Sequence, residues 1–149
     1  MIAIACDHTA VELKKEIEAL LDEMNLPYRD FGTDSTASVD YPVFAERAAR
    51  AVASGECEKG IVLCGTGLGV SLAANKVRGI RCALCGDCYS AEMARRHNNA
   101  NMLAMGARVI GPELAKRIAR IFLTTDFAGG RHARRVDMIM ALEEGKTLQ

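Results

Sequence analysis

Several features that often reveal a function are missing from this chain of 149 residues. Its 19 basic and 19 acidic residues cancel, so nothing indicates a broad surface for nucleic acid. There is no low-complexity tract, no block of like charges and no internal repeat. No apolar run approaches the ~20 residues of a membrane span, and the N-terminus lacks the basic flank and cleavage site of a signal peptide. We therefore expect a soluble cytoplasmic protein that binds neither nucleic acid nor membrane.

The chain also lacks the common cofactor motifs. Neither the G-x-G-x-x-G dinucleotide fingerprint nor the G-x-x-x-x-G-K-[ST] phosphate loop occurs. Cys82, Cys85 and Cys88 form a C-x2-C-x2-C string, but no fourth ligand follows at zinc-like or iron–sulfur-like spacing. Cys82 and Cys85 fall in an expected strand, where an odd separation sends two side chains to opposite faces. We expect no metal site and no disulfide framework, and we interpret Cys6, Cys82 and Cys85 as buried free thiols.

What the sequence does contain is an alternation of strand and helix patterns. Strands are expected at residues 2–6, 28–31, 61–64 and 80–85, with a fifth at either 102–105 or 108–110. Helices are expected at residues 10–25, 41–54, from the glycine-rich loop to about 77, 90–97, 112–125 and 131–144. Half of the residues are hydrophobic, which suits one compact domain over residues 1–149. The order predicts an α/β fold: a parallel sheet covered on both faces, with ligands beyond the carboxyl ends of the strands.

The most informative segment spans residues 60–76, where a strand ends in Cys64 and three alternating glycines lead into a helix. Glycine lets backbone N–H groups approach a ligand, and a helix N-terminus favours negative charge, so this loop is suited to hold an anion. The same surroundings favour the thiolate form of a cysteine. On this segment alone, a tight strand-to-helix turn without a ligand remains an alternative.

Asp7, His8 and His97 also stand at the expected ends of elements. Asp7 and His8 follow the first strand; they, or Thr9, either cap the next helix or face the same sheet edge as Cys64. His97 ends a helix, where it either interacts with the helix dipole or takes part in catalysis. The residues alone leave both alternatives open.

Arg131 and Arg135 stand four residues apart on the last expected helix and so share one face, with Arg108 upstream. They form either a solvated basic face or a clamp for phosphate, whose oxygens match guanidinium forks. Gly129 and Gly130 favour the clamp because they deliver Arg131 to a helix N-terminus. The same glycines separate the last two helices, so the final helix packs elsewhere on the chain or on a partner. Together, the thiol, histidine, loop donors and arginines suit proton transfer next to a carbonyl in a phosphorylated substrate.

Over essentially its whole length the chain resembles the type B ribose-5-phosphate isomerases and the related galactose-6-phosphate isomerase subunits. The resemblance rests on ordered motifs: Cys6-Asp7-His8, Val39-Asp40-Tyr41-Pro42, Cys64-Gly-Thr-Gly-Leu-Gly, Ala73-Ala-Asn-Lys76, Arg96-His97-Asn98, Gly106-Ala107-Arg108-Val109 and Gly129-Gly-Arg-His-Ala-Arg-Arg135. It implies a Rossmann-like α/β/α sandwich with a five-stranded parallel sheet, and a homodimer or dimer of dimers with sites at the subunit interface. It also implies interconversion of ribose 5-phosphate and ribulose 5-phosphate in the pentose phosphate pathway, through a cis-enediolate and without metal or cofactor.

The resemblance further implies a role for each site residue. Cys64 is the base that moves a proton between C1 and C2, and His97 opens the furanose ring with help from Thr66. The developing oxyanion is held by Asn98 and by the backbone of Gly65, Thr66, Gly67, Leu68 and Gly69. Asp7 binds sugar hydroxyls, Tyr41 lines the pocket, and the phosphate is bound by His8, Arg108, Arg131 and Arg135.

Two positions bear on the base and on the sugar. Some members use a glutamate directly after the glycine loop; here that position is Val70, which accepts no proton, so Cys64 is retained as the base. The resemblance departs at Thr9-Ala10, where relatives often carry two very small residues, and a larger Thr9 would narrow the pocket or shift the sugar preference. Isomerisation of galactose or allose 6-phosphate is therefore an alternative, and a non-catalytic module that binds a phosphosugar is another.

Overall fold

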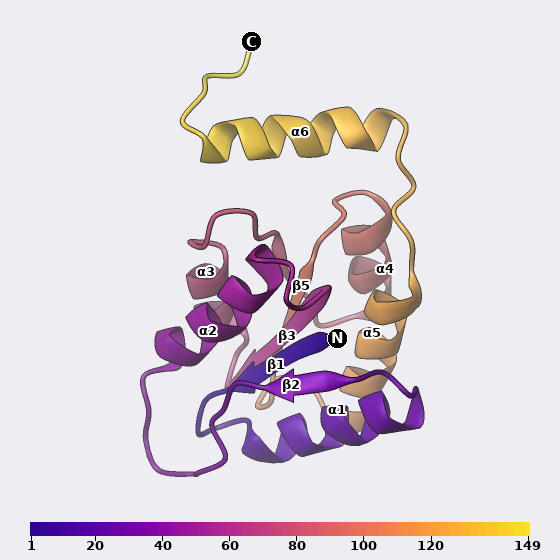
Figure 1. The fold of residues 1–149 in the computed structure, drawn as a ribbon. Coiled ribbons are helices and arrows are strands. Elements are labelled where there is room, and N and C mark those ends of the chain that lie inside the picture. The colour runs from indigo at the N-terminus through magenta and orange to yellow at the C-terminus, as the bar shows by residue number, and fades with distance from the viewer.

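Strands and helices alternate along the chain in the computed structural model, which describes residues 1–149 (Figure 1). The strands are β1 (Ile2–Cys6), β2 (Tyr28–Asp30), β3 (Lys59–Cys64), β4 (Cys82–Leu84) and β5 (Met102–Gly106). The helices are α1 (Val11–Glu23), α2 (Tyr41–Ala53), α3 (Leu68–Ala74), α4 (Cys88–Arg96), α5 (Pro112–Thr124) and α6 (Arg131–Glu143). The alternation predicted from the sequence is confirmed. The fifth strand is the first of its two candidates, since residues 107–109 form a turn.

All five strands belong to one parallel sheet in the order β2-β1-β3-β5-β4. From β1 the chain moves outward to β2 and then returns to the other side of β1 with β3. The direction of winding therefore switches between β1 and β3. Ligands of open α/β sheets bind beyond the carboxyl ends of the strands at such a switch. In this protein the residues at that place are those that follow Cys6 and Cys64.

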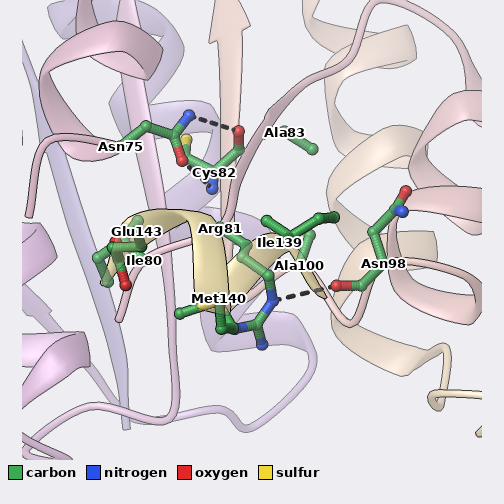
Figure 2. Close-up of a pocket in the computed structure, with 10 residues that line it drawn as sticks. All are labelled: Asn75, Ile80, Arg81, Cys82, Ala83, Asn98, Ala100, Ile139, Met140 and Glu143. Atoms are coloured by element: carbon green, nitrogen blue, oxygen red, sulfur yellow. Dashed lines mark hydrogen bonds between the residues drawn. The ribbon is translucent and has the colours of Figure 1, made fainter. Parts of the chain in front are cut away.

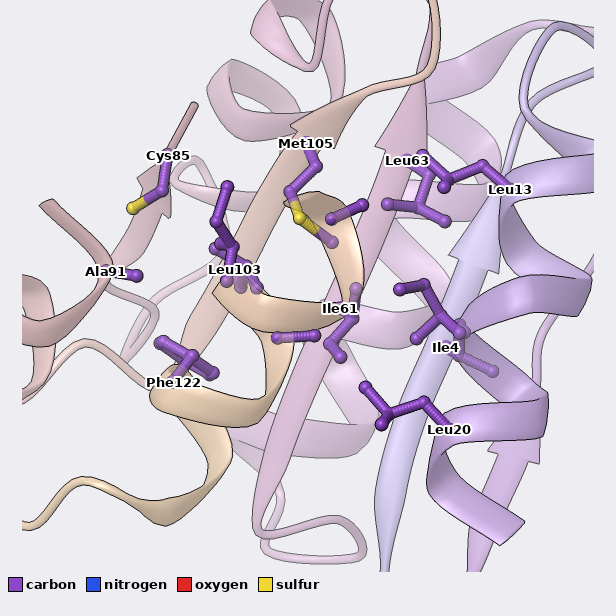
Figure 3. Packing of buried hydrophobic residues seen from close by; sticks show 14 of the residues in the cluster. Ile4, Leu13, Leu20, Ile61, Leu63, Cys85, Ala91, Leu103, Met105 and Phe122 are labelled. Atoms are coloured by element: carbon purple, nitrogen blue, oxygen red, sulfur yellow. The ribbon is translucent and has the colours of Figure 1, made fainter. Parts of the chain in front are cut away.

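Helices cover both faces of the sheet and give the predicted Rossmann-like sandwich. On one face, α1, α4 and α5 enclose a cluster that includes Ile4, Ile61, Leu103 and Phe122, all fully buried (Figure 3). On the other face, α2 and α3 pack against the intervening strand positions, among them Cys64. Because side chains alternate along a strand, each central strand supplies both clusters. This is why the central strands read as continuous apolar runs.

Helix α1 illustrates how the sequence pattern leads to packing. Leu13, Ile17, Leu20 and Leu21 recur at helical spacing, and all four are buried against the sheet. Burying a side chain of this size contributes about 1.5–3 kcal/mol. The apolar stripe therefore both forms the helix and fixes which of its sides faces the strands.

Helix α3 is shorter than the sequence predicts and ends at Ala74 rather than near Val77. The cause is Asn75, whose side-chain oxygen accepts a hydrogen bond from the backbone N–H of Cys82 at 2.8 Å. Its side-chain nitrogen donates to the carbonyl oxygen of Cys82 at 2.9 Å. The end of α3 is thereby tied to the edge strand β4, which itself covers only three residues.

The six cysteines are all free. Cys6 and Cys85 are buried as predicted, whereas the prediction is wrong for Cys82, which is half-buried because it lies on an edge strand. Cys85 belongs to the cluster under α4 and Cys82 packs against the opposite one, which confirms that they face opposite sides of the sheet. No group of three or more His, Cys, Asp or Glu side chains is arranged as a metal site.

Helix α6 stands apart from the layered body at the end of an extended segment (Figure 1). Only Val136 of this helix is buried, while Ile139 and Leu142 are exposed. The helix contacts the body through Met140 and Glu143, which accept hydrogen bonds from Arg81 and from a backbone N–H respectively. The apolar side chains left uncovered indicate a surface for further packing. No helix combines the length and the apolar character needed to cross a bilayer.

Candidate active site

Cys64 lies at the carboxyl end of β3 and is only 5% exposed. Its Sγ accepts a hydrogen bond from the backbone N–H of Gly67 at 3.1 Å. Gly67 has φ of +78°, a left-handed conformation that side chains disfavour, and this conformation turns the loop back over the thiol. A thiolate accepts such a bond more strongly than a neutral thiol does. The loop thus places a backbone donor directly on a candidate nucleophile or base.

The loop is held in place by the end of β5. The backbone N–H groups of Ala107 and Arg108 donate to the carbonyl oxygens of Cys64 and Gly65, at 2.8 and 2.9 Å. A Cβ on Gly106 would lie 2.5 Å from the carbonyl carbon of Thr66, so two backbones are in direct contact. The loop conformation therefore depends on the packing of β3 against β5, and the remaining N–H groups are fixed before any ligand arrives.

Asp7 follows β1 and is joined to β3 through a hydrogen bond from its N–H to the carbonyl oxygen of Leu63. Its Oδ1 accepts two hydrogen bonds, from the N–H and the hydroxyl of Thr9, at 2.9 and 2.6 Å. Helix α1 begins only at Val11 and has no side-chain cap. The interpretation of Asp7, His8 or Thr9 as the helix cap is therefore wrong. The carboxylate is engaged by Thr9 before the helix starts.

Three more predicted residues lie around the same sheet edge. His8 Nδ1 accepts the N–H of Val39 at 3.2 Å, which leaves Nε2 to carry the proton in the neutral ring. The ring of Tyr41 lies 2.6 Å from where a Cβ on Gly69 would be. The guanidinium of Arg108 reaches within 3.7 Å of the corresponding point on Gly65. We refer to Asp7, His8, Tyr41, Cys64, Arg108 and the loop Gly65–Gly69 as the thiol cluster.

A second group of polar residues lines a hollow of about 430 Å³. We call it the histidine cluster; its members are His97, Asn98, Arg131, His132 and Arg135. His97 follows the last turn of α4, and Arg131 is the first residue of α6. Arg131 and Arg135 line one hollow from α6, as expected for two residues four apart on a helix, and the structure adds His97 beside them. With two guanidinium groups and no carboxylate in its lining, the hollow is suited to an anion such as phosphate.

His132 is the member of this cluster that sequence reasoning missed. Its ring stacks on that of His97, with ring centroids 4.1 Å apart and planes at 11°. Burial lowers the pKa of His132, and the neighbouring His97, Arg131 and Arg135 lower it further. The available signal was its spacing, since His132 stands three residues before Arg135 and so shares its helix face.

The two clusters lie at opposite ends of the strands. Asn98 lies at the amino ends, because its carbonyl oxygen accepts a hydrogen bond at 3.1 Å from Arg81, which directly precedes β4. Cys64 pairs in register with Gly106 at the other end of β5. Five residues of parallel strand span roughly 13 Å at about 3.3 Å per step. A single chain therefore does not bring Cys64 together with His97, Arg131 or Arg135.

Comparison with known proteins gives this arrangement a context. A family model described as Ribose/Galactose Isomerase matches residues 2–139. The chain belongs to the ribose/galactose isomerase family. Ribose-5-phosphate isomerase B of Escherichia coli is 49% identical over 143 residues, which are 96% of each chain. D-erythrulose-4-phosphate isomerase of Pectobacterium atrosepticum is 47% identical over 139 residues, 93% of this chain and 91% of its own.

Solved structures agree with the family assignment. That of ribose-5-phosphate isomerase B from Clostridium thermocellum has a TM-score of 0.95 and 51% identity, covering 98% of this chain and 99% of its own. The family recognised from the sequence motifs is thereby confirmed, and so is the five-stranded parallel fold. As a ribose/galactose isomerase, the protein is an enzyme that isomerises a sugar phosphate.

This isomerase has another hollow, of about 420 Å³, between α6 and the start of β4 (Figure 2). Arg81 crosses it and donates hydrogen bonds to the carbonyl oxygens of Asn98 and Asn99 and to the sulfur of Met140. The guanidinium is thus occupied by protein acceptors. It fixes the loop that follows His97, which makes this hollow a support for the histidine cluster and not a second site.

Proposed function

We propose that this isomerase, acting as one domain over residues 1–149, interconverts ribose 5-phosphate and ribulose 5-phosphate through a cis-enediolate. The observation that carries the proposal is Cys64 beneath a loop of backbone donors. The thiolate takes the proton from C2 of the open-chain aldose, and the electron pair forms the C1–C2 double bond of the enediolate. The thiol returns that proton to C1 while the O2 hydroxyl gives its proton to O1. Atoms and electrons balance over these two steps, so the reaction needs no oxidant, reductant, metal or cofactor.

The other predicted residues have complementary tasks in this reaction. His97 opens the furanose ring: it takes the proton of the anomeric hydroxyl, the C1–O4 bond breaks as the C1 carbonyl forms, and the imidazolium gives the proton to O4, with Thr66 assisting. Loop N–H groups and Asn98 hold the oxyanion of the enediolate. Asp7 binds sugar hydroxyls beside Tyr41, and the phosphate is bound by His8, Arg108, Arg131 and Arg135. We assign this activity to the cytoplasm and to the pentose phosphate pathway.

We further propose a homodimer in which the histidine cluster of one protomer completes the thiol cluster of its partner. The support is the separation of these clusters within one chain. Uncovered apolar side chains add to it: Leu68 and Leu72 share one face of α3 beside the loop and are 55% and 65% exposed, and Tyr89 is 71% exposed. A monomer gains by burying such groups against a second copy.

Cys64→Ala and Cys64→Ser test the base directly. Removing a general base costs about 10²–10⁴-fold in turnover, so both folded variants should lose nearly all aldose–ketose conversion. Cys88→Ser is the matched control, because Cys88 is a half-buried thiol outside the thiol cluster. Near-normal turnover in both Cys64 variants would remove Cys64 from the mechanism.

Mixed dimers test the shared site. Cys64→Ala and His97→Asn should each be inactive alone. When equal amounts are dissociated and reassociated, about half of the dimers carry both chains, and each of these has one of its two sites intact. Recovery of about a quarter of wild-type activity is expected. If both clusters act within one chain, no mixture recovers activity.

Kinetics with sugar phosphates of different carbon-chain length test the choice of substrate, because a relative is named for a four-carbon sugar phosphate. The values of kcat/KM for tetrose, pentose and hexose phosphates should be highest for ribose 5-phosphate. Preference for galactose or allose 6-phosphate would instead favour a hexose-phosphate isomerase. Exchange of solvent deuterium into C1 and C2 separates any isomerase from a binding module, which leaves those protons in place.

A further inference from the structure

The carboxylate of Asp7 is almost entirely buried, at 5% exposure, yet only one of its oxygens is bonded. Oδ1 accepts both hydrogen bonds from Thr9, while Oδ2 accepts none from the protein. No buried side-chain oxygen in the structure lacks a partner, so Oδ2 must keep contact with solvent. On an otherwise buried carboxylate, this oxygen is the free acceptor that stays open to the outside, so it is available to accept a hydrogen bond from a ligand.

Thr9 determines how that carboxylate is oriented. Its hydroxyl lies 2.6 Å from Oδ1, and its N–H approaches the same oxygen at 2.9 Å. The same hydroxyl oxygen lies 3.4 Å from where a Cβ on Gly65 would be, so it sits between Asp7 and the loop after Cys64. Rotation of the carboxylate out of its plane would break both hydrogen bonds.

We propose that Thr9 is a positioning residue that holds Oδ1 of Asp7, so that Oδ2 offers a fixed acceptor to a hydroxyl of the sugar. This inference rests on the proposed function, in which Asp7 binds sugar hydroxyls. The chemistry recognised is the carbon chain with its hydroxyls, and not the phosphate. Loss of the Thr9 hydroxyl therefore weakens binding of the sugar in its reactive orientation and leaves phosphate recognition intact.

Thr9→Val tests this role because it keeps the side-chain volume and removes only the hydroxyl donor. A hydrogen bond to a carboxylate is strong enough that its loss should lower kcat/KM for ribose 5-phosphate roughly ten- to a hundredfold. Thr9→Ser retains the donor and should stay within about threefold of wild type. The inhibition constant of inorganic phosphate should be unchanged in both variants, whereas general damage to the loop would alter it.

A double-mutant cycle with Asp7→Ala, which removes the acceptor of both Thr9 hydrogen bonds, tests whether Thr9 acts through Asp7. If it does, Thr9→Val causes no further loss in kcat/KM once Asp7 is Ala. Independent, additive losses would overturn the proposal. So would a Thr9→Val enzyme with wild-type kinetics, or equal losses in Thr9→Val and Thr9→Ser. An unmodified chain that converts no aldose phosphate refutes the proposed function itself, whereas an active chain indifferent to Thr9→Val refutes only the role of Thr9.

Discussion

Gly67→Ala should damage both stability and turnover, because Gly67 links the loop conformation to the thiol. Its φ of +78° is a left-handed conformation, which costs an alanine about 1–2 kcal/mol. The new Cβ would lie 2.8 Å from the backbone carbonyl carbon of Met105 and 3.1 Å from the nitrogen of Gly106. Those atoms belong to a central strand and cannot move cheaply.

The contact of the new Cβ with the Leu84 side chain costs less stability than its contact with the backbone of β5. Leu84 Cδ1 would lie 2.5 Å away, but Leu84 is partly exposed and can rotate. Overpacking against the rigid strand adds about 1–3 kcal/mol, which gives a total loss of roughly 2–5 kcal/mol in the free energy of unfolding. Displacing the N–H of residue 67 from the sulfur should also lower kcat by about 10²-fold or more.

Urea unfolding and steady-state kinetics at one protein concentration measure the two effects. Gly86→Ala is the matched control, since nothing lies within 4 Å of its would-be Cβ and its φ is not positive. It should change stability by no more than about 0.5 kcal/mol. A Gly67→Ala enzyme with wild-type stability and kcat would refute the claim that the left-handed turn holds the donor on Cys64.

Three further outcomes follow from neighbouring contacts. In Gly69→Ala the nearest atoms to the new Cβ belong to the 40%-exposed Tyr41 ring, at 2.6 Å. The free energy of unfolding should therefore change by less than about 1 kcal/mol, while the KM for the sugar phosphate rises. Burial raises the pKa of Cys6 from 9.0 to about 12, so the unfolded chain loses this proton first and stability falls as pH rises from 9.0 towards 12. Cys6 contributes a slope of about 1.4 kcal/mol per pH unit. Between pH 8 and 10, urea titrations should show a smaller fall in the free energy of unfolding for Cys6→Ala than for the wild type, while Cys82 and Cys85, whose pKa values burial also raises, keep their contributions. Arg131→Ala should raise KM for the sugar phosphate by about tenfold, while Arg134→Ala, exposed on the same helix but outside the hollow, should not; equal KM values would assign both arginines to solvent.

The sequence predicted most elements because their causes are local. The apolar spacing of residues 13–21 specified α1, and the run of residues 61–64 specified β3. Where prediction failed, the cause was a side-chain hydrogen bond that the apolar pattern does not report. Helix α3 stops early because the side chain of Asn75 pairs with Cys82. Asp7 accepts from Thr9, two residues on, instead of capping α1, and the sequence alone left both arrangements open.

By itself, the sequence determined the alternation of strands and helices, the glycine loop after Cys64 and the family motifs. The tertiary structure alone decided which of these residues meet. Periodicity reports burial but not neighbours, so nothing local indicates that β5 inserts between β3 and β4. That insertion seats the glycine loop against Gly106. His97 lies at the opposite end of the strands from Cys64 because it follows α4, which returns the chain to the start of β5. The same packing stacks His132 on His97. One chain consequently carries two separated clusters, because one lies where the parallel strands start and the other lies where they end.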